Sequence, residues 1–293
     1  MAQVGFLYDG CRFEGYKVCH PYRPVNLITR VLREITFKFF PIFSSAFYNK
    51  ECFVGEYAHI IVWDPLITKS FLIRLHKLHP KAQIDFVYWN MVGKCSHLTP
   101  NHIPYFVRKW TYDGYDSEKY GLKLYSTYPY YKRFIRPHNS NQYDVLFVGR
   151  DKGRGKYLLE LENQMKSLGL KTKFIITKSD RLSKKKSYYQ QELTYDEICD
   201  LVSHSRSVLN VTMDNQQGIT LRDLEYVYQG VKLITTNSSI CKTSIYHPNN
   251  VFVIGEANIK DLPAFLNVQM IPLSKKVIKH HTLHAFITEI TSS

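Results

Sequence analysis

Short apolar runs alternate along this chain with segments whose apolar residues recur at helical spacing. Regular alternation of strands and helices is typical of parallel sheets joined by crossover helices, so the pattern predicts an α/β fold. Asp64 and Pro65 carry the N-cap and first-residue signals of one helix. The elements expected in the first half are a strand at 4–8, a helix at 24–37, a strand at 59–63, a helix at 65–78, a strand at 84–88 and shorter pieces at 105–109, 109–112 and 123–126.

The second half repeats the alternation more plainly, and Thr194 with Glu197 forms the pattern of a capping box. Residues 136–142 are polar and turn-rich, which places a domain boundary there and predicts domains at 1–138 and 139–293. The elements expected beyond it are strands at 145–148, 173–177, 207–211, 232–235 and 251–254, helices at 157–168, 194 onward, 219–229 and 258–267, and a closing helix near 283–290 that crosses to the first domain.

The segment 217–225 has the layout of a glycine turn that opens a helix between two strands. In an open α/β sheet, a helix N-terminus at this place is suited to hold phosphate, and Gly218 lets a ligand approach the backbone closely. The predicted contacts come from Gln217, Gly218, Thr220, Arg222 and Glu225, with Glu225 accepting hydrogen bonds from ribose hydroxyls. The alternative is a surface ion pair between Arg222 and Glu225, worth about 0.3 kcal/mol.

A second candidate element is the basic, glycine-rich turn that follows the strand at 145–148. It is not a Walker A loop, because Gly149 and Gly155 are one residue too far apart and Tyr157 replaces the Ser or Thr that would bind magnesium. The basic side chains could instead neutralise a diphosphate directly. The alternative is that the turn is simply exposed to solvent and binds no ligand. The candidate diphosphate contacts are Gly149, Arg150, Lys152, Arg154 and Lys156.

Together the two elements resemble the nucleotide-binding half of the GT-B glycosyltransferases. Gly149-Arg150 with Lys152 or Lys156 is similar to the motif that holds the donor diphosphate in that group, and Glu225 matches the second Glu of its Glu-x7-Glu pair. The resemblance implies two Rossmann-like domains whose parallel sheets face a central cleft, with the first domain on the acceptor side. Gln217 departs from the pattern, because it replaces the first Glu, and this leaves retention or inversion of the sugar's configuration open.

A closer resemblance is to bacterial capsule and lipopolysaccharide biosynthesis proteins that are identified as glycosyltransferases. It covers roughly residues 55–255 and rests on the segments 88–90, 110–113, 116–123, 147–154, 217–222 and 232–237. The resemblance implies a hexosyltransferase-type enzyme that moves a sugar from a nucleotide-diphosphate sugar to a lipid-linked or oligosaccharide acceptor. No cofactor beyond this donor substrate is expected.

Composition sets wider bounds on the class of protein. With 293 residues and 44% hydrophobic content, the chain can fill one large or two ordinary domains. Its six cysteines show no regular framework, as suits reduced thiols, and no apolar segment is long enough for a membrane span. A zinc site from Cys11, Cys19 and His20 is not favoured. We expect a cytoplasmic protein, either soluble or peripheral at the inner face of the membrane.

The formal net charge of +14 points to an anionic partner. Nucleic acid is the least favoured partner, because the sequence contains no recognisable nucleic-acid-binding module. Contact with an anionic membrane is better supported: the 24–37 helix carries Ile28, Val31, Leu32 and Ile35 on one face, and basic Arg30, Arg33 and Lys38 flank Phe37, Phe39 and Phe40. The alternative places these phenylalanines in the core. Residues 184–186 are expected to form a solvated lysine loop.

An inverting GT-B enzyme needs a base on the acceptor side. Asp9 and Asp64 follow predicted strands and are the candidates, although this position is more typical of a turn or cap residue. His20, His97 and His102 are alternatives without further support. Asp116 with Glu118 lacks the second Asp of a metal motif, and no metal is expected. Two other functions remain open: a nucleotide-sugar-binding protein without turnover, and a basic nucleic-acid-binding protein.

Overall fold

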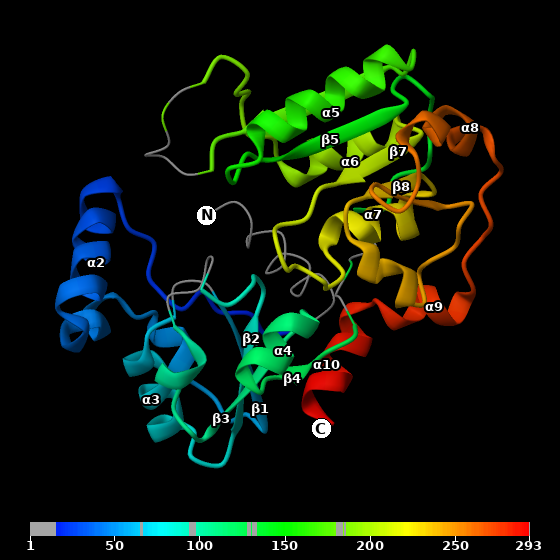
Figure 1. The fold of residues 1–293 in the computed structure, drawn as a ribbon. Coiled ribbons are helices and arrows are strands. Elements are labelled where there is room, and N and C mark those ends of the chain that lie inside the picture. Colours follow the sequence, from blue (N-terminus) through cyan, green and yellow to red (C-terminus); the bar gives the residue numbers. More distant parts are fainter. Residues whose placement is uncertain are drawn as a thin grey trace. The chain divides into compact units, whose positions relative to one another are not determined.

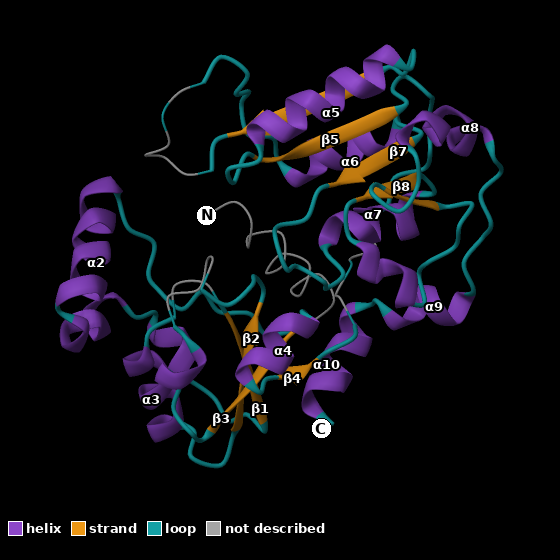
Figure 2. Ribbon diagram, in the orientation of Figure 1, coloured by secondary structure: helices purple, strands orange, loops and turns teal. Residues whose placement is uncertain are grey.

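The computed structural model describes residues 16–64, 67–93, 98–127, 130, 134–179, 184 and 186–292 (Figure 1). The described chain divides into two compact units. Unit 1 runs from residue 16 through Thr127 and takes in the chain again from Phe286 onward. Unit 2 is the intervening Tyr128–Ala285. Each unit is built on its own sheet of parallel strands, which confirms the predicted α/β fold (Figure 2).

Unit 1 contains four parallel strands in the order β1-β2-β3-β4. The strands are β1 (His59–Trp63), β2 (Gln83–Tyr88), β3 (Val107–Thr111) and β4 (Lys123–Leu124). The helices of this unit are α2 (Leu27–Phe39), α3 (Lys69–Leu78) and α4 (Gly114–Tyr120), with 3-10 turns at Pro41–Phe47, Lys50–Phe53 and Pro100–His102.

Both faces of this sheet are covered. On one face, β2 residues Ile84, Phe86 and Tyr88 pack with Phe71 and Leu75 of α3 in the same hydrophobic cluster. The other face meets α10 (Leu283–Thr291), whose fully buried Phe286 stacks on Trp63 at 6.0 Å between ring centroids. A segment near the end of the chain therefore closes the sheet of the first unit.

A buried ion pair links this second face to α10. Asp85 of β2 is fully buried and accepts hydrogen bonds from Arg108 Nε at 2.7 Å and from Trp110 Nε1 at 2.9 Å. Arg108 Nη2 also donates to the carbonyl of Ile290 at 3.0 Å. Because a buried carboxylate needs a cation and several donors, this network fixes β2, β3 and α10 together.

Unit 2 contains five parallel strands in the order β6-β5-β7-β8-β9. The strands are β5 (Val145–Arg150), β6 (Thr172–Thr177), β7 (Ser207–Asn210), β8 (Lys232–Thr235) and β9 (Val251–Val253). The helices are α5 (Gly155–Ser167), α6 (Tyr195–Ser203), α7 (Leu221–Gln229), α8 (Leu262–Asn267) and α9 (Lys275–His280), with 3-10 turns at Ser238–Lys242 and Ile259–Asp261.

Alternate residues of β5 enter two different clusters. Val145 and Phe147 pack with α5 and α8, whereas Leu146 and Val148 pack with residues of α6 and α7. Helices therefore cover both faces of this sheet, which explains why its strands read as continuous apolar runs rather than as alternating ones.

Most predicted elements are confirmed, including the strands at 59–63 and 232–235 and the Thr194 capping box. Two helix starts were wrong: α2 begins at Leu27 rather than at residue 24, and α3 begins at Lys69, where Thr68 rather than Asp64 accepts the capping hydrogen bond. The short helices α4 and α9 were not predicted. The predicted strand at 4–8 lies outside the described residues. Within the described part of the chain, no helix is long and apolar enough to cross a membrane.

Candidate functional site

The order of strands in unit 2 creates a switch point between β5 and β7. From β5 the chain moves outward to β6 and then returns to β7 on the other side of β5. In open α/β sheets, ligands bind outside the carboxyl ends of the strands at such a point. The turn 151–154 after β5 and the loop 211–220 after β7 both leave from this edge.

Asp151 organises the turn after β5. It is 1% exposed, and its Oδ1 accepts from the backbone N–H of Gly155, the first residue of α5. Its Oδ2 accepts from Lys186 Nζ at 3.0 Å, Tyr188 at 2.8 Å and Tyr189 at 2.7 Å. Burial alone would raise the pKa of this carboxyl, but these hydrogen bonds outweigh burial and lower it. Lys186 is exposed, as expected for a solvated lysine loop, although its ammonium group pairs with Asp151.

Arg154 bridges the switch point. Its guanidinium donates to the carbonyl of Val211, just beyond β7, and Nη2 donates to the carbonyl of Arg150, at the end of β5, at 2.9 Å. Burial lowers the pKa of Arg154, and the charge of Asp151 offsets this effect only in part. The hydrogen-bond acceptors described for Arg154 are thus neutral carbonyls, and the nearby carboxylate of Asp151 supplies part of the opposing charge.

The start of α7 is capped from within unit 2. Fully buried Asp223 accepts from the backbone N–H and the hydroxyl of Thr220, at 2.7 and 2.9 Å. Asn210 at the end of β7 donates to Asp223 at 2.8 Å and so ties the helix to the sheet. These contacts fix the N-terminus of α7 through Asn210, Thr220 and Asp223. The carboxylate of Asp223 therefore already lies at the helix start where a phosphate was expected.

Arg222 and Glu225 form the ion pair expected at this spacing, but the pair is not on the surface. Their side chains are 14% and 1% exposed, and Arg222 Nη2 also donates to the carbonyl of Val148 on β5 at 2.9 Å. Burial raises the pKa of Glu225 to about 7 in spite of the opposing charge of Arg222. Glu225 is therefore enclosed, and its predicted contact with a ribose stays a prediction.

The loop between β7 and α7 is held by the end of β8. Asn237 Nδ2 donates to the carbonyl of Gln217 at 3.1 Å, and the backbone N–H of Thr212 donates to the hydroxyl of Thr236 at 2.9 Å. The side chain of Gln217 is exposed, whereas Gly218 is buried beneath it. The ends of β5, β7 and β8 thus meet around one edge.

The remaining basic candidates are spread around the turn. Arg150 pairs with Glu192 at 3.0 Å, and the backbone of Lys152 has a left-handed φ of 47° and donates to Ser179 at 2.7 Å. Lys156 is 93% exposed on the surface of α5, where it lies 3.7 Å from Glu160. Arg150, Arg154 and Arg222 therefore all reach backbone or side-chain partners near the carboxyl edge, while Lys156 points to solvent.

In unit 1, Asp64 stands directly after β1 and is 1% exposed. Its Oδ1 accepts a short hydrogen bond from the backbone N–H of Trp89, which follows β2, while Oδ2 has no hydrogen-bond partner among the described residues. Burial raises the pKa of Asp64 to about 7. A carboxyl with one unpartnered oxygen and this pKa can exchange a proton near neutral pH.

The other candidate bases have less support. Asp9 and His97 lie outside the described residues. His20 is exposed, and His102 Nδ1 lies 2.6 Å from the hydroxyl of Thr99. Asp116 is buried within α4 and accepts from the backbone N–H of Val92 at 2.7 Å, so its carboxylate has a structural contact.

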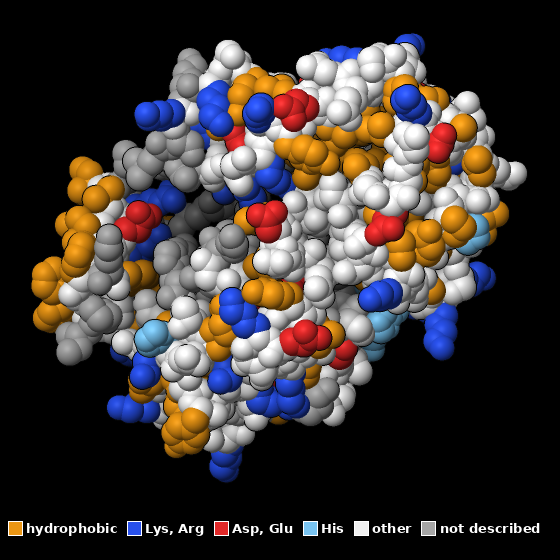
Figure 3. Space-filling view, in the orientation of Figure 1, with side chains coloured by type: hydrophobic (Ala, Val, Ile, Leu, Met, Phe, Trp, Pro, Cys, Tyr) orange, Lys and Arg blue, Asp and Glu red, His pale blue; other side chains and the backbone are white. Residues whose placement is uncertain are grey.

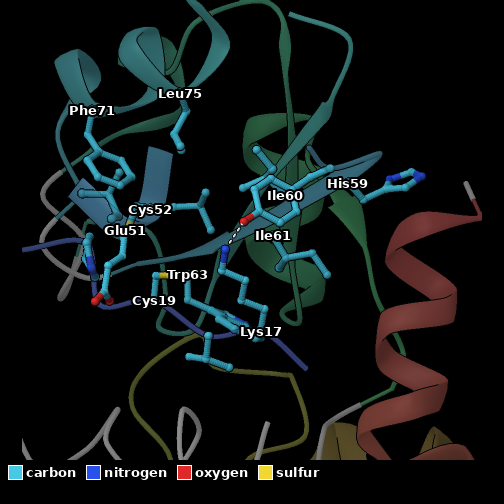
Figure 4. Close-up of a pocket in the computed structure, with 15 residues that line it drawn as sticks. Lys17, Cys19, Glu51, Cys52, His59, Ile60, Ile61, Trp63, Phe71 and Leu75 are labelled. Atoms are coloured by element: carbon cyan, nitrogen blue, oxygen red, sulfur yellow. Dashed lines mark hydrogen bonds between the residues drawn. The ribbon is translucent and has the colours of Figure 1, made fainter. Parts of the chain in front are cut away.

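A cavity of about 170 Å³ lies against β1, and none of the candidate bases is among its lining residues. Figure 4 shows Lys17 reaching across it toward the hydroxyl of Tyr57, with the thiols of Cys19 and Cys52 nearby. Burial, followed by the neighbouring Cys19, raises the pKa of Cys52 to about 12, so its thiol is a poor nucleophile at neutral pH.

Comparison with known proteins assigns no family: the chain matches no family model, and no curated protein is significantly similar to it.

Asp151, Asp223 and Asn237 organise the site but were not predicted from the sequence. The Thr220-x-x-Asp223 spacing could have revealed the cap, since it follows the capping-box pattern. Asp151 offered no comparable signal, because its side-chain partners Lys186, Tyr188 and Tyr189 lie 35 to 38 residues away.

Proposed function

We propose that the protein is a GT-B-type glycosyltransferase that moves a sugar from a nucleotide-diphosphate sugar to a glycan or lipid-linked acceptor in surface polysaccharide assembly. The observation that carries the proposal is Arg154, a partly buried cation held by neutral carbonyls at the switch point of unit 2. A cation in this setting favours an anionic ligand, because its hydrogen bonds go to neutral carbonyls and Asp151 offsets the effect of its burial only in part.

In this proposal the donor diphosphate lies at the carboxyl edge of β5 and β7. Arg154 and Arg150 contact its oxygens, and the flexible side chain of Lys152 adds a point charge. Enclosed Glu225 orients Arg222 beneath the same edge through their ion pair. The arginines, rather than a metal, balance the charge that develops on the leaving diphosphate.

The transfer itself exchanges one bond for another. The acceptor hydroxyl oxygen forms a bond to the anomeric carbon, while the bond from that carbon to the diphosphate oxygen breaks and its electron pair leaves with the nucleoside diphosphate. The hydroxyl proton passes to a base. Asp64 is our candidate, because its Oδ2 has no hydrogen-bond partner among the described residues and burial raises its pKa to about 7, so this carboxyl can accept the proton.

The first test is a thermal-shift series with UDP, GDP, ADP, CMP and dTDP, each with and without magnesium. One diphosphate should stabilise the protein without the metal, by about 2.7 kcal/mol at 100 times its dissociation constant. That nucleotide then defines the donor class for transfer assays. If none of the nucleotides shifts the midpoint, the proposed nucleotide site is wrong.

A substitution of Arg154 tests whether the diphosphate binds at this edge of the sheet. Arg154→Gln should weaken nucleoside diphosphate binding by about 10-fold or more while changing nucleoside binding little, because charge-assisted hydrogen bonds to the phosphates are lost. Lys166→Ala removes one charge from the far end of α5 and is the matched control. Arg150→Ala serves as a second variant if the Arg154 replacement does not fold. Equal losses for nucleoside and diphosphate would count against a phosphate role.

A non-catalytic nucleotide-sugar-binding protein is the second candidate. The observation that favours it is Gln217, an exposed amide where related enzymes carry a carboxylate. This candidate predicts nucleotide-sugar binding without hydrolysis or transfer to any acceptor. Turnover of the bound sugar nucleotide would exclude it.

A further inference from the structure

Helix α2 in unit 1 is oriented with its apolar face toward solvent. Its exposed residues include Ile28 at 73%, Leu32 at 54% and Ile35 at 43% exposure. Val31 and Phe39 of the helix are also at least half exposed, and the patch continues past the end of the helix through Phe40 and Phe43. Figure 3 shows these apolar side chains gathered along the outer side of α2.

The opposite side of α2 holds it to unit 1. Phe37 packs on Tyr22 at 4.8 Å between ring centroids, and Arg33 is 2% exposed with its guanidinium 5.5 Å from the same ring. A helix of a globular protein normally buries its apolar stripe and exposes its charges. Here a cation is buried and an aliphatic stripe is exposed, so the outer face of α2 is suited to a partner outside the folded core.

The charge around α2 indicates which partner. Between residues 17 and 50 the sequence has six basic residues, one Glu and no Asp, and Glu51 follows directly. Arg33 is buried and Arg30 pairs with Glu34, whereas Lys17, Arg23 and Lys50 are exposed. An apolar helical face within a basic segment matches the surface of an anionic membrane, where acyl chains take up the apolar residues and the headgroups attract the cations.

We propose that the outer face of α2, with Phe39, Phe40 and Phe43, docks on the surface of an anionic lipid bilayer. Helix α2 has 13 residues and is about 20 Å long, so it lies in the plane of the interface rather than crossing the bilayer. The apolar side chains enter the boundary between headgroups and acyl chains. This proposal does not depend on the glycosyltransferase assignment, since it uses no residue of the unit 2 site.

The test is co-sedimentation of the full chain with phosphatidylcholine vesicles that contain or lack phosphatidylglycerol. We expect binding only to the vesicles with phosphatidylglycerol, and weaker binding as salt is raised, because the electrostatic part of the attraction is screened. Replacing Ile28, Leu32 and Ile35 with Ser should reduce binding by about 10-fold or more, because apolar area is withdrawn from the interface.

A matched control replaces three exposed apolar residues elsewhere, Tyr105, Val268 and Ile271, with Ser and should bind as the wild type does. Circular dichroism and thermal unfolding show whether each variant remains folded. Absent binding to either kind of vesicle, or equal binding by the α2 variant and the wild type, would overturn the proposal. So would light scattering that shows a dimer for the wild type and a monomer for the α2 variant, since a second copy would then cover this face.

Discussion

Two carboxyl groups of this protein have opposite environments that follow from their neighbours. Asp151 is surrounded by donors and remains ionised, whereas Asp64 receives few hydrogen bonds and its burial favours the neutral form. Both follow parallel strands, and both are 1% exposed. Position at a strand end therefore does not decide the chemistry of a carboxyl; the number of donors around it does.

Asp64 should make stability depend on pH. Its folded pKa of about 7 lies above the unfolded value of about 3.9, so its stabilising contribution is complete below about pH 4 and is lost as pH rises through 7. The difference in unfolding free energy between wild type and Asp64→Asn should change in that window, by at most about 4 kcal/mol. Denaturant unfolding of both proteins at pH 4 to 8 measures it. A difference that stays constant across this range would show that Asp64 titrates normally.

Asp151 should matter for the fold as well as for the turn. Asp151→Asn leaves Lys186 without its carboxylate and weakens the bonds from Tyr188 and Tyr189, so we expect a loss of about 2 kcal/mol or more. Urea unfolding measures the loss. Asp214→Asn, at an exposed position, is the control and should change stability by less than about 0.5 kcal/mol. A loss no greater than the control's would mean that the network contributes little.

At the scale of the element, α10 is attached to unit 1 by its polar side as well as by Phe286. Glu289 accepts from the backbone N–H groups of Ser126 at 2.9 Å and Thr127 at 3.0 Å, and from both hydroxyls. Burial alone would raise the pKa of Glu289, but the hydrogen bonds from Thr127 and Ser126 outweigh burial and lower it. One carboxylate thus anchors the helix to the chain that leaves β4.

Replacing Glu289 with Ala should therefore destabilise unit 1 by about 2 kcal/mol, because two backbone donors lose their acceptor. The effect should be present above about pH 5 and decline as pH falls through the lowered pKa, since the protonated wild type loses the same bonds. Chemical denaturation at pH 3 and pH 7 tests this. Glu118→Ala, on the exposed side of α4, is the control. An equal loss at both values would contradict an ionic role.

Across the whole molecule, the sequence predicted most elements because strands buried on both faces form short apolar runs, as in β5 and β8. Which side of a helix faces the core was harder to predict. The spacing in α2 indicates an amphipathic helix, but not that Arg33 turns inward while Ile28 turns outward. The exposed Phe39 and Phe40 agree with the surface interpretation, whereas Phe37 packs on Tyr22 as the core alternative required.

The candidate site was predicted in part, for a physical reason. Local motifs indicated the turn after β5 and the start of α7, since turn and cap chemistry depends on neighbouring residues. The bonds from Arg154 to Val211 and from Asn237 to Gln217 join residues 57 and 20 positions apart. Such contacts depend on strand order, which a single sequence does not specify.

The division of the chain has a consequence for the order in which the protein is made. Unit 1 needs Phe286 and Ile290 to cover one face of its sheet, yet the ribosome adds these residues only after all of unit 2. The usual sequence, in which the N-terminal domain folds first during synthesis, cannot be completed here. Unit 2 can finish folding first. Until α10 has been synthesised and packs on unit 1, Trp63 and the charged side chain of Asp85 lack the residues that cover them in the folded protein.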